Sequence, residues 1–486
     1  MFFNSIDFAI FFPIVLTLYW MVSKQLTLRN IVLLLASYVF YGWWDWRFLL
    51  LIVISSAVDF SVGKKIAATE KRTTRKAWLI VSLCVNIGLL AYFKYVNFFI
   101  TSFIDGFRLL GAELDITPLS IILPVGISFY TFQTLSYTID IYRKKIQPTE
   151  NVLSFFTFVA FFPQLVAGPI ERASHLLPQF QKTHLLVYEQ VKSGLLLVGF
   201  GLFKKMVIAD RAAVLVNTVY ESPSDYKGLE VIIATILFAF QIYCDFSGYT
   251  DIARGTARMM GFDLMKNFNA PYFSRSITMF WHRWHISLST WFRDYVYFPL
   301  GGNKKGHYRT YLNLFIVFVV SGLWHGAAIT FLIWGAIHGI IIVIEKAIRN
   351  TISQDFIDKK SNYLSKFLLG TMTFTVVCFA WIFFRAETVT DAIIMIENLC
   401  KPADTFLFSE KGDTLGLDRT HMMVLWIAII GLLALEYIGH YKNVYKILQK
   451  QHSIIRWSVY VISVYILIIY GYYGYEDRSQ FIYFQF

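Results

Sequence analysis

The stretch 310–344 constrains the fold of this chain more than any other part, because it contains no lysine, arginine, aspartate or glutamate. As a single helix it would be about 50 Å long, well beyond the roughly 30 Å of a bilayer's hydrocarbon core. It must therefore break, tilt strongly or cross twice. Two glycines flank a histidine near its middle, in the sequence Ser-Gly-Leu-Trp-His-Gly at 321–326, and this is the predicted weak point.

Long apolar runs recur along the whole chain. Of its 486 residues, 56% are hydrophobic and only 16% are charged, against about a quarter charged in soluble domains. Uncharged runs near the roughly 20 residues that a transmembrane helix needs lie at 8–23, 77–93, 119–139, 151–170, 367–384 and 457–475, with shorter or interrupted runs at 31–58, 191–209 and 231–248.

These runs predict an all-α polytopic membrane protein with roughly 10 to 13 crossings. We expect one integral-membrane domain over 1–486. Its motifs lie between about 155 and 345, and its C-terminal spans lie within 367–486.

The charge balance is basic, since 44 lysine and arginine residues exceed 32 aspartate and glutamate residues by 12. In a membrane protein such an excess is typical of cytoplasmic loops. The sequence shows no soluble basic domain that could bind the phosphate backbone of a nucleic acid. We therefore expect the lipid bilayer as a partner and expect no nucleic acid. The cysteines lie far apart with no Cys-x-x-Cys pair, so neither a disulfide framework nor a zinc site is expected.

Residues 251–310 do not look like a span, because nine basic and three acidic residues are interleaved with aromatic ones. This mixture is typical of helices that lie in the membrane interface or re-enter the bilayer. Two roles stay open, namely anchoring at the lipid surface or a basic cytoplasmic mouth for a polyanionic substrate such as the phosphates of coenzyme A. For the second role the candidate donor-binding residues are Arg283, Arg293, Lys304 and Lys305.

Two histidines three residues apart lie within this segment. The sequence Phe-Trp-His-Arg-Trp-His-Ile-Ser-Leu-Ser at 280–289 places His282, His285 and Ser289 on one face of a predicted helix. A pair at this spacing could bind a metal. No glutamate neighbours it and no third ligand is evident, so we expect no metal.

His325 is the best single candidate for chemistry, because an ionisable group inside an apolar span is costly to bury. A desolvated histidine stays neutral near pH 7 and can take a proton from an attacking hydroxyl. The alternative is a structural histidine bonded to a backbone carbonyl, and we favour that role for His338.

Two aspartates lie at the end of the apolar run 231–248, in the sequence Tyr-Cys-Asp-Phe-Ser-Gly-Tyr-Thr-Asp at 243–251. Asp245 and Asp251 could pair with Arg254 and Arg258 to brace a helix, or they could position the site. We favour bracing.

Six ordered blocks together resemble the membrane-bound O-acyltransferase (MBOAT) family, and within it the bacterial branch that includes the integral-membrane subunit of alginate O-acetyltransferase. The resemblance covers nearly the whole chain. The blocks are Phe-Pro-Gln-Leu-Val-Ala-Gly-Pro-Ile-Glu at 162–171, Asp-Phe-Ser-Gly-Tyr at 245–249, the histidine block at 280–289, Arg-Asp-Tyr at 293–295, Pro-Leu-Gly-Gly-Asn at 299–303 and Trp-His-Gly at 324–326.

The resemblance implies a ring of helices, with re-entrant helices, around a central tunnel in which cytoplasmic and outer funnels meet at a histidine. The family's catalytic histidine corresponds here to His325 and its second polar residue to His285, with Trp324, Ser289 and Asp245 as supporting residues. Related proteins often carry arginine where His282 stands, so no catalytic role is transferred to it. The family does not indicate whether His325 is itself acylated or acts only as a base.

The segment 480–486, Gln-Phe-Ile-Tyr-Phe-Gln-Phe, contains one hydroxyl among its aromatic rings. It fits an interfacial aromatic belt. Alternatively, Tyr483 docks in the outer funnel and relays the acyl group as a tyrosyl ester, or docks a partner enzyme.

The sequence therefore predicts an O-acyltransferase in the bacterial plasma (inner) membrane. It would take acetyl groups from a cytoplasmic thioester donor, acetyl-CoA, and pass them across the bilayer for O-acetylation of a cell-surface polysaccharide, either alginate-like or peptidoglycan. No cofactor is expected, and an extracytoplasmic acetyltransferase or esterase-like partner would complete the transfer. The alternatives are D-alanyl transfer to teichoic acid from a carrier-protein thioester, a transporter with a proton relay through His325 and Asp245, and a scaffold for a partner enzyme.

Overall fold

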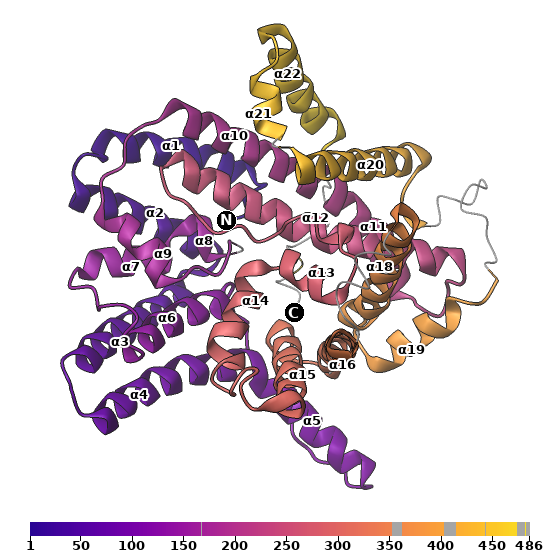
Figure 1. The fold of residues 1–486 in the computed structure, drawn as a ribbon, viewed down its shortest axis with the longest axis horizontal. Helices are drawn as coiled ribbons and strands as arrows, with labels where there is room; N and C mark the ends of the chain where they lie inside the picture. The colour runs from indigo at the N-terminus through magenta and orange to yellow at the C-terminus, as the bar shows by residue number, and fades with distance from the viewer. Residues whose placement is uncertain (167, 352–361, 403–414, 443, 474–481, 483–486) are drawn as a thin grey trace. The chain divides into compact units, whose positions relative to one another are not determined.

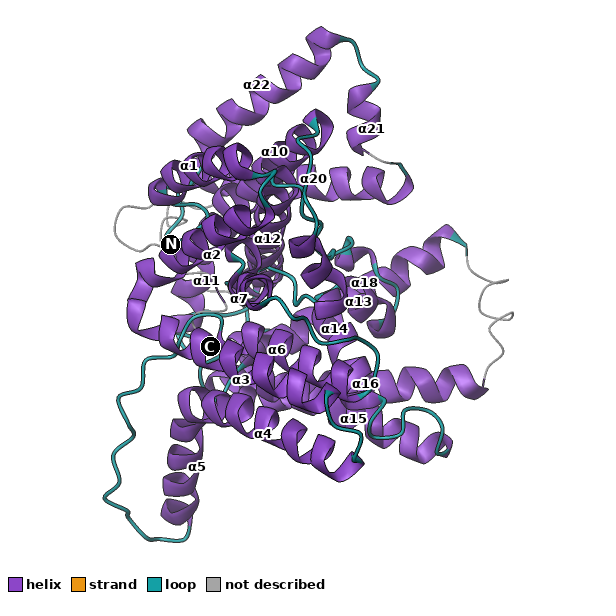
Figure 2. Ribbon diagram, turned by 90° about the vertical axis from the view of Figure 1, so that its left-hand side faces the viewer, coloured by secondary structure: helices purple, strands orange, loops and turns teal. Residues whose placement is uncertain are grey.

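The structure is a computed structural model that describes residues 1–166, 168–351, 362–402, 415–442, 444–473 and 482. Within these ranges the regular secondary structure is entirely helical, as Figure 2 shows. The all-α prediction is confirmed for this part of the chain.

Most helices are long, but those between 152 and 181 and between 271 and 297 are short, and so is the helix at Val444–Gln449. In chain order they are α1 (Ile6–Val22), α2 (Leu26–Asp45), α3 (Leu49–Ala67), α4 (Arg72–Leu90), α5 (Val96–Leu109), α6 (Ile127–Tyr142), α7 (Val152–Ala160), α8 (Phe162–Leu165), α9 (Ala173–Leu176), α10 (Tyr188–Leu202), α11 (Asp210–Glu221), α12 (Leu229–Met259), α13 (Ile277–Arg283), α14 (Ile286–Phe292), α15 (Gly306–His325), α16 (Ile329–Thr351), α18 (Tyr363–Arg385), α19 (Val389–Asn398), α20 (Arg419–Tyr441), α21 (Val444–Gln449) and α22 (Ser453–Tyr470).

Seven stretches of the described residues are long and apolar enough to cross a membrane, so the chain is a multi-pass membrane protein. Two of them, 42 and 38 residues long, each contain two α-helices. The number of 10 to 13 crossings and the ring around a tunnel stay predictions. The seven stretches are Leu26–Ala67, Arg72–Leu109, Leu229–Met259, Ile329–Asn350, Tyr363–Arg385, Arg419–Gly439 and Ser453–Tyr470.

Two of the predicted apolar runs form shorter helices than a span requires. In the run 119–139, α6 begins only at Ile127, because Gly126 adopts a positive φ of 76° and Pro124 lies just before it. The run 151–170 divides into α7 and α8, with Pro163 in the first turn of α8. Glycine in the left-handed region and proline at a first turn are both helix boundaries.

The chain divides into two compact units, each described here by itself. Unit 1 comprises residues 1–198 and 252–265, and unit 2 comprises 199–251 and 266–486. The expectation of a single domain over 1–486 stays a prediction.

In unit 1, helices α3, α4 and α6 lie side by side (Figure 1) and share buried polar groups. The Ser82 hydroxyl donates to one carboxylate oxygen of Asp59 at 2.5 Å, and the Asn86 amide donates to the other at 2.8 Å. Ser55 donates to the Asn86 carbonyl at 2.7 Å. Polar groups inside an apolar layer need such partners, so this network fixes how the three helices pack.

In unit 2, α15 and α16 form a helical hairpin, because α15 ends at His325 and α16 begins at Ile329. Of the three outcomes open for the run 310–344, the structure shows a break. The two backbones approach closely at glycines. A Cβ on Gly322 would lie 2.2 Å from the Phe331 carbonyl oxygen, and one on Gly335 would lie 2.4 Å from the Phe318 carbonyl oxygen. Small residues allow this approach in membrane helices. The weak point predicted at 321–326 is thus a tightly packed turn.

Candidate functional site

The structure brings His285 and His325 together in unit 2. Their ring centroids lie 6.2 Å apart, and both side chains are buried. His285 precedes α14, whereas His325 is the last residue of α15, so 40 residues of sequence separate two rings that are neighbours in space. The two histidines transferred from the family resemblance therefore occupy one site.

His285 lies in a kink between two short helices. The helix α13 ends at Arg283, and His285 adopts left-handed backbone angles with φ 42° and ψ 54°. A non-glycine residue in this region is strained by roughly 1–3 kcal/mol, and such strain clusters at active sites. The kink corrects the predicted helix over 280–289, because His282 is exposed while His285 is fully buried.

Asn267 holds the strained kink in place. Its backbone carbonyl accepts from the Ile286 N–H at 2.9 Å. Its side-chain oxygen accepts from both the backbone N–H and the hydroxyl of Ser287, at 3.2 and 2.9 Å. These bonds flank His285 and compensate for its backbone strain.

Both histidines are enclosed by aromatic rings. The ring of Trp324 lies 5.9 Å from that of His285, and the ring of Trp334 lies 5.0 Å from that of His325. Phe246, next to Asp245 on α12, packs edge-on against His285 at 4.7 Å. Burial lowers the pKa of His285 to about 3, so its imidazole is neutral at physiological pH.

A cavity of about 590 Å³ is lined by residues close in sequence to the two histidines, although neither His285 nor His325 belongs to its wall. It is lined by Ile286, directly after His285, and by Ser321, one helical turn before His325. Ser289 also lines it, and the Ser289 hydroxyl donates to the Trp284 carbonyl at 3.4 Å. The remaining wall is largely apolar, from α13, α14, α15 and α16.

Three cationic side chains line this cavity, but only one of them was a candidate from the sequence. Arg293 lines it as expected, while Arg283, Lys304 and Lys305 do not belong to its wall. The other two cations are Lys346 and Arg349 on α16. These two cations were missed at the sequence level, although the sequence contains the pattern that indicates them. Ile342, Lys346 and Arg349 follow the i, i+4, i+7 spacing of one helix face at the end of the uncharged run.

Asp245 and Asp251 each pair with a lysine. Lys205 contacts both Asp210 and Asp245, with its ammonium nitrogen 2.7 Å from a carboxylate oxygen of each. Lys204 pairs with Asp251. Both lysines lie in a π-helix, Phe203–Ala209, which turns consecutive side chains toward α12. The two aspartates thus connect α12 to the π-helix through lysines that were not predicted as partners from the sequence.

Asp245 also binds a residue far along the chain. Its second carboxylate oxygen accepts from the backbone N–H of Ile482 at 2.7 Å, and the Ile482 side chain is buried. Tyr483 lies outside the described residues. Asp245 therefore anchors the backbone of the residue that directly precedes Tyr483.

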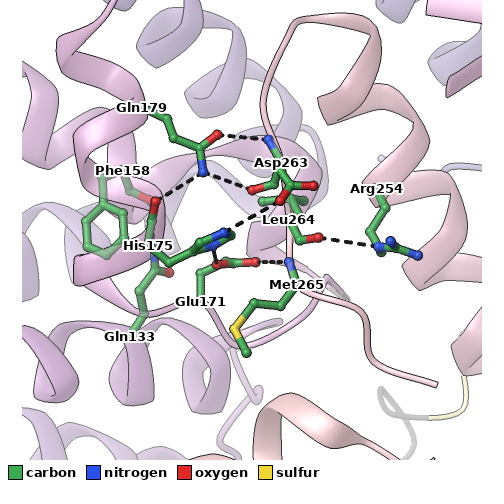
Figure 3. A network of polar contacts seen from close by, with 9 residues as sticks. All are labelled: Gln133, Phe158, Glu171, His175, Gln179, Arg254, Asp263, Leu264 and Met265. Carbon is green, nitrogen blue, oxygen red and sulfur yellow. Dashed lines mark hydrogen bonds and ion pairs between the residues drawn. The ribbon is translucent and has the colours of Figure 1, made fainter. Parts of the chain in front are cut away.

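Glu171, the last residue of the block 162–171, belongs to a polar clamp in unit 1 (Figure 3). Glu171, fully buried, accepts from His175 Nδ1 at 2.8 Å and from the backbone N–H of Met265 at 2.6 Å. Gln179 accepts from the Asp263 N–H and donates to the Asp263 carbonyl, at 2.8 and 3.0 Å. The clamp fixes the loop after α12, and the chain reaches Asn267 two residues later.

The clamp predicts a pH-dependent stability. The hydrogen bond to Glu171 raises the pKa of His175, and Asp263 is the other charged group facing the imidazole. A histidine with a raised folded-state pKa contributes stability that is full below about pH 6.5 and is lost as pH rises through the raised value. Thermal unfolding in detergent should therefore show an advantage of wild type over His175→Gln that shrinks between pH 6 and pH 8.5. An advantage that grows with pH would contradict this.

Helices long enough to span a bilayer define a multi-pass membrane protein, and its buried histidine pair is a candidate reaction site. No group of three histidine, cysteine or acidic side chains in the described residues could hold a metal ion. Comparison with known proteins identifies the family. The model of the MBOAT, membrane-bound O-acyltransferase family matches residues 15–385, and the chain therefore belongs to this family of acyltransferases.

Individual relatives agree with this assignment. The chain is 40% identical over 398 residues to the probable alginate O-acetylase AlgI of Pseudomonas aeruginosa, covering 82% of this chain and 74% of that protein. It is 35% identical over 404 residues to the peptidoglycan O-acetyltransferase of Helicobacter pylori, covering 78% and 75%. With the teichoic acid D-alanyltransferase of Bacillus subtilis the identity is 28% over 283 residues, covering 56% and 70%. The resemblance drawn from the six motif blocks is confirmed.

Proposed function

We propose that this enzyme O-acetylates an exported or cell-surface polysaccharide, taking acetyl groups from cytoplasmic acetyl-CoA and passing them across the bacterial inner membrane. The observation that carries the proposal is the buried pair of His285 and His325 beside a cavity lined with cations. Relatives that acetylate alginate and peptidoglycan support the acetyl group and the polysaccharide acceptor. An extracytoplasmic acetyltransferase or esterase-like partner completes the transfer to the glycan.

In this proposal His325 is the general base of the acetyl transfer. The neutral imidazole takes the proton of an attacking hydroxyl, whose oxygen forms the new ester bond to the acetyl carbon. The carbon–sulfur bond of the thioester breaks, and the proton passes to the leaving thiolate, which restores the neutral histidine. The aromatic enclosure excludes water and so protects the thioester from hydrolysis.

Lys346 and Arg349 bind the phosphates of the donor in this proposal, together with Arg293. The double variant Lys346→Gln, Arg349→Gln should raise KM for acetyl-CoA about 10-fold and leave kcat within twofold, because uniform binding is lost. The matched control is Lys304→Gln, Lys305→Gln, which removes two cations outside the cavity wall. If both double variants raised KM equally, the cavity would not be the donor site.

Tyr483 relays the acetyl group on the outer side as a tyrosyl ester in this proposal. The support is its direct neighbour Ile482, which Asp245 anchors in unit 2. Tyr483→Phe removes only the hydroxyl and should abolish acetyl ester on the glycan, whereas Phe484→Tyr should not. Glycan acetylation that survives Tyr483→Phe undiminished would eliminate the relay.

The proposed function is tested by base-released acetate from the cell-surface glycan fraction. Cells expressing wild type are compared with cells lacking the protein, and D-alanine is measured in the same samples. Loss of acetate alone supports the proposal. Loss of D-alanine instead would assign the protein to teichoic acid D-alanylation, the second candidate, which the lower similarity to a D-alanyltransferase favours less. If neither changed, polysaccharide acylation would be refuted.

A further inference from the structure

Glu345 on α16 attaches the first turn of α13 to α16. One carboxylate oxygen accepts from the Ile277 N–H at 2.6 Å. The other accepts from the backbone N–H and the hydroxyl of Thr278, at 2.9 and 2.6 Å. Hydrogen bonds to an ionised group are about twice as strong as neutral ones, and a carboxylate also suits the positive end of a helix.

A second bond attaches the other end of α13 to the same helix. The indole N–H of Trp281 donates to Nδ1 of His338 at 3.3 Å. His338 and Glu345 are seven residues apart on α16 and therefore share one face. With only seven residues α13 is too short to be stable alone, so these contacts with α16 set its position.

The helix α16 also determines where His325 lies. It packs on α15 with the close glycine contacts at Gly322 and Gly335, which leave no room for sliding. Trp334 of α16 contacts the His325 ring edge-on at 5.0 Å. The helix that holds α13 is thus the helix against which His325 is placed.

His285 follows α13 after a single residue, Trp284. From these contacts we infer that Glu345 is a positioning residue, which acts through α13 to hold His285 at its distance from His325. Glu345 is not part of the cavity wall, so its effect on the reaction is indirect. The inference rests on the proposed function, because it assumes that both histidines serve acetyl transfer.

The variant Glu345→Gln tests the inference, since glutamine keeps the size but presents an NH₂ group to the N–H donors of α13. The assay is transfer from radiolabelled acetyl-CoA to glycan in inverted membrane vesicles. We expect kcat to fall about 10- to 100-fold, because a displacement near 1 Å at a reacting group costs about 100-fold in rate. KM for acetyl-CoA should stay within twofold, the opposite of the pattern expected for the adjacent Lys346.

A matched control exists on α19. The Asp391 carboxylate accepts from the backbone N–H and the hydroxyl of Thr388, at 3.2 and 2.7 Å, as the Glu345 carboxylate does from Thr278. Asp391→Asn therefore removes an equivalent helix cap away from the histidines. It should leave both kcat and KM within twofold of wild type.

A second variant keeps the test decisive if Glu345→Gln aggregates on gel filtration. Thr278→Val removes one of the three hydrogen bonds and should lower kcat about 3- to 10-fold. Wild-type kcat in folded Glu345→Gln, or in Thr278→Val where the first variant does not fold, overturns the inference. Vesicles in which His325→Ala transfers acetyl groups as fast as wild type overturn the role of the histidine pair, and the inference with it. Wild-type vesicles that transfer no acetyl group to glycan would refute the proposed function itself.

Discussion

Replacing His325 with alanine will lower acetyl ester on the glycan at least 100-fold at matched membrane expression. A positioned general base typically contributes 10²–10⁴-fold to a rate. The His325 ring is held between the rings of Trp324 and Trp334, and alanine would leave no base at this position. The measurement is acetate released by mild base from the cell-surface fraction. His285→Ala should also reduce acetate strongly, because its ring is the neighbouring imidazole at 6.2 Å.

The control for this prediction is His452→Ala. His452 is exposed at the start of α22 and lies outside the histidine pair, so its loss should leave acetate unchanged. A His325→Ala variant that retained wild-type acetate would make this histidine structural. The enzyme would then need a different base, and the role transferred from the family motif would be wrong.

Family membership and the contacts of Asp245 together argue against the transporter alternative. A proton relay through His325 and Asp245 would need Asp245 to exchange protons with its surroundings. Instead, the Lys205 ammonium group and the Ile482 amide both bind its carboxylate oxygens, which fits a structural role. The match to an acyltransferase family over residues 15–385 leads to the same conclusion.

Features of the fold that depend on a few neighbouring residues could be predicted from the sequence. The absence of charge over 310–344 and the glycines at 322 and 326 predicted the weak point of this run, and α15 ends there, at His325. A helix break depends on the backbone freedom of a few neighbouring residues, and glycines in the sequence indicate where that freedom is high. The same holds for Gly126, where α6 begins later than the apolar run.

Long-range pairing could not be predicted from local pattern. The sequence favoured a continuous helix through His285, but Asn267 stabilises a strained kink there through bonds across 20 residues. Likewise Asp245 was paired with arginines close in sequence, whereas Lys205 reaches it from another helix because a π-helix redirects its side chain. Which of several cations lies opposite a carboxylate depends on helix packing, and a single sequence does not determine this.

Removing the buried Lys205 is expected to produce the largest stability effect in the protein. Lys205→Met leaves Asp210 and Asp245 without this cation in a site where the lysine is 1% exposed. Breaking a buried ion pair on one side costs about 3–5 kcal/mol, because the remaining charge is not compensated. The midpoint of thermal unfolding in detergent should fall by about 3–5 °C, because the unfolding entropy of a chain this long is about 1 kcal/mol per kelvin.

Two further variants distinguish lost charge compensation from a mere change of side chain. Lys64→Met removes a lysine whose partner Glu150 is 82% exposed, and it should change stability by less than about 1 kcal/mol because water screens that pair. Adding Asp210→Asn and Asp245→Asn to Lys205→Met should restore most of the lost stability, since a fully neutral site holds no uncompensated charge. If this triple variant were no more stable than Lys205→Met, the loss would come from packing around the lysine stem rather than from the two carboxylates.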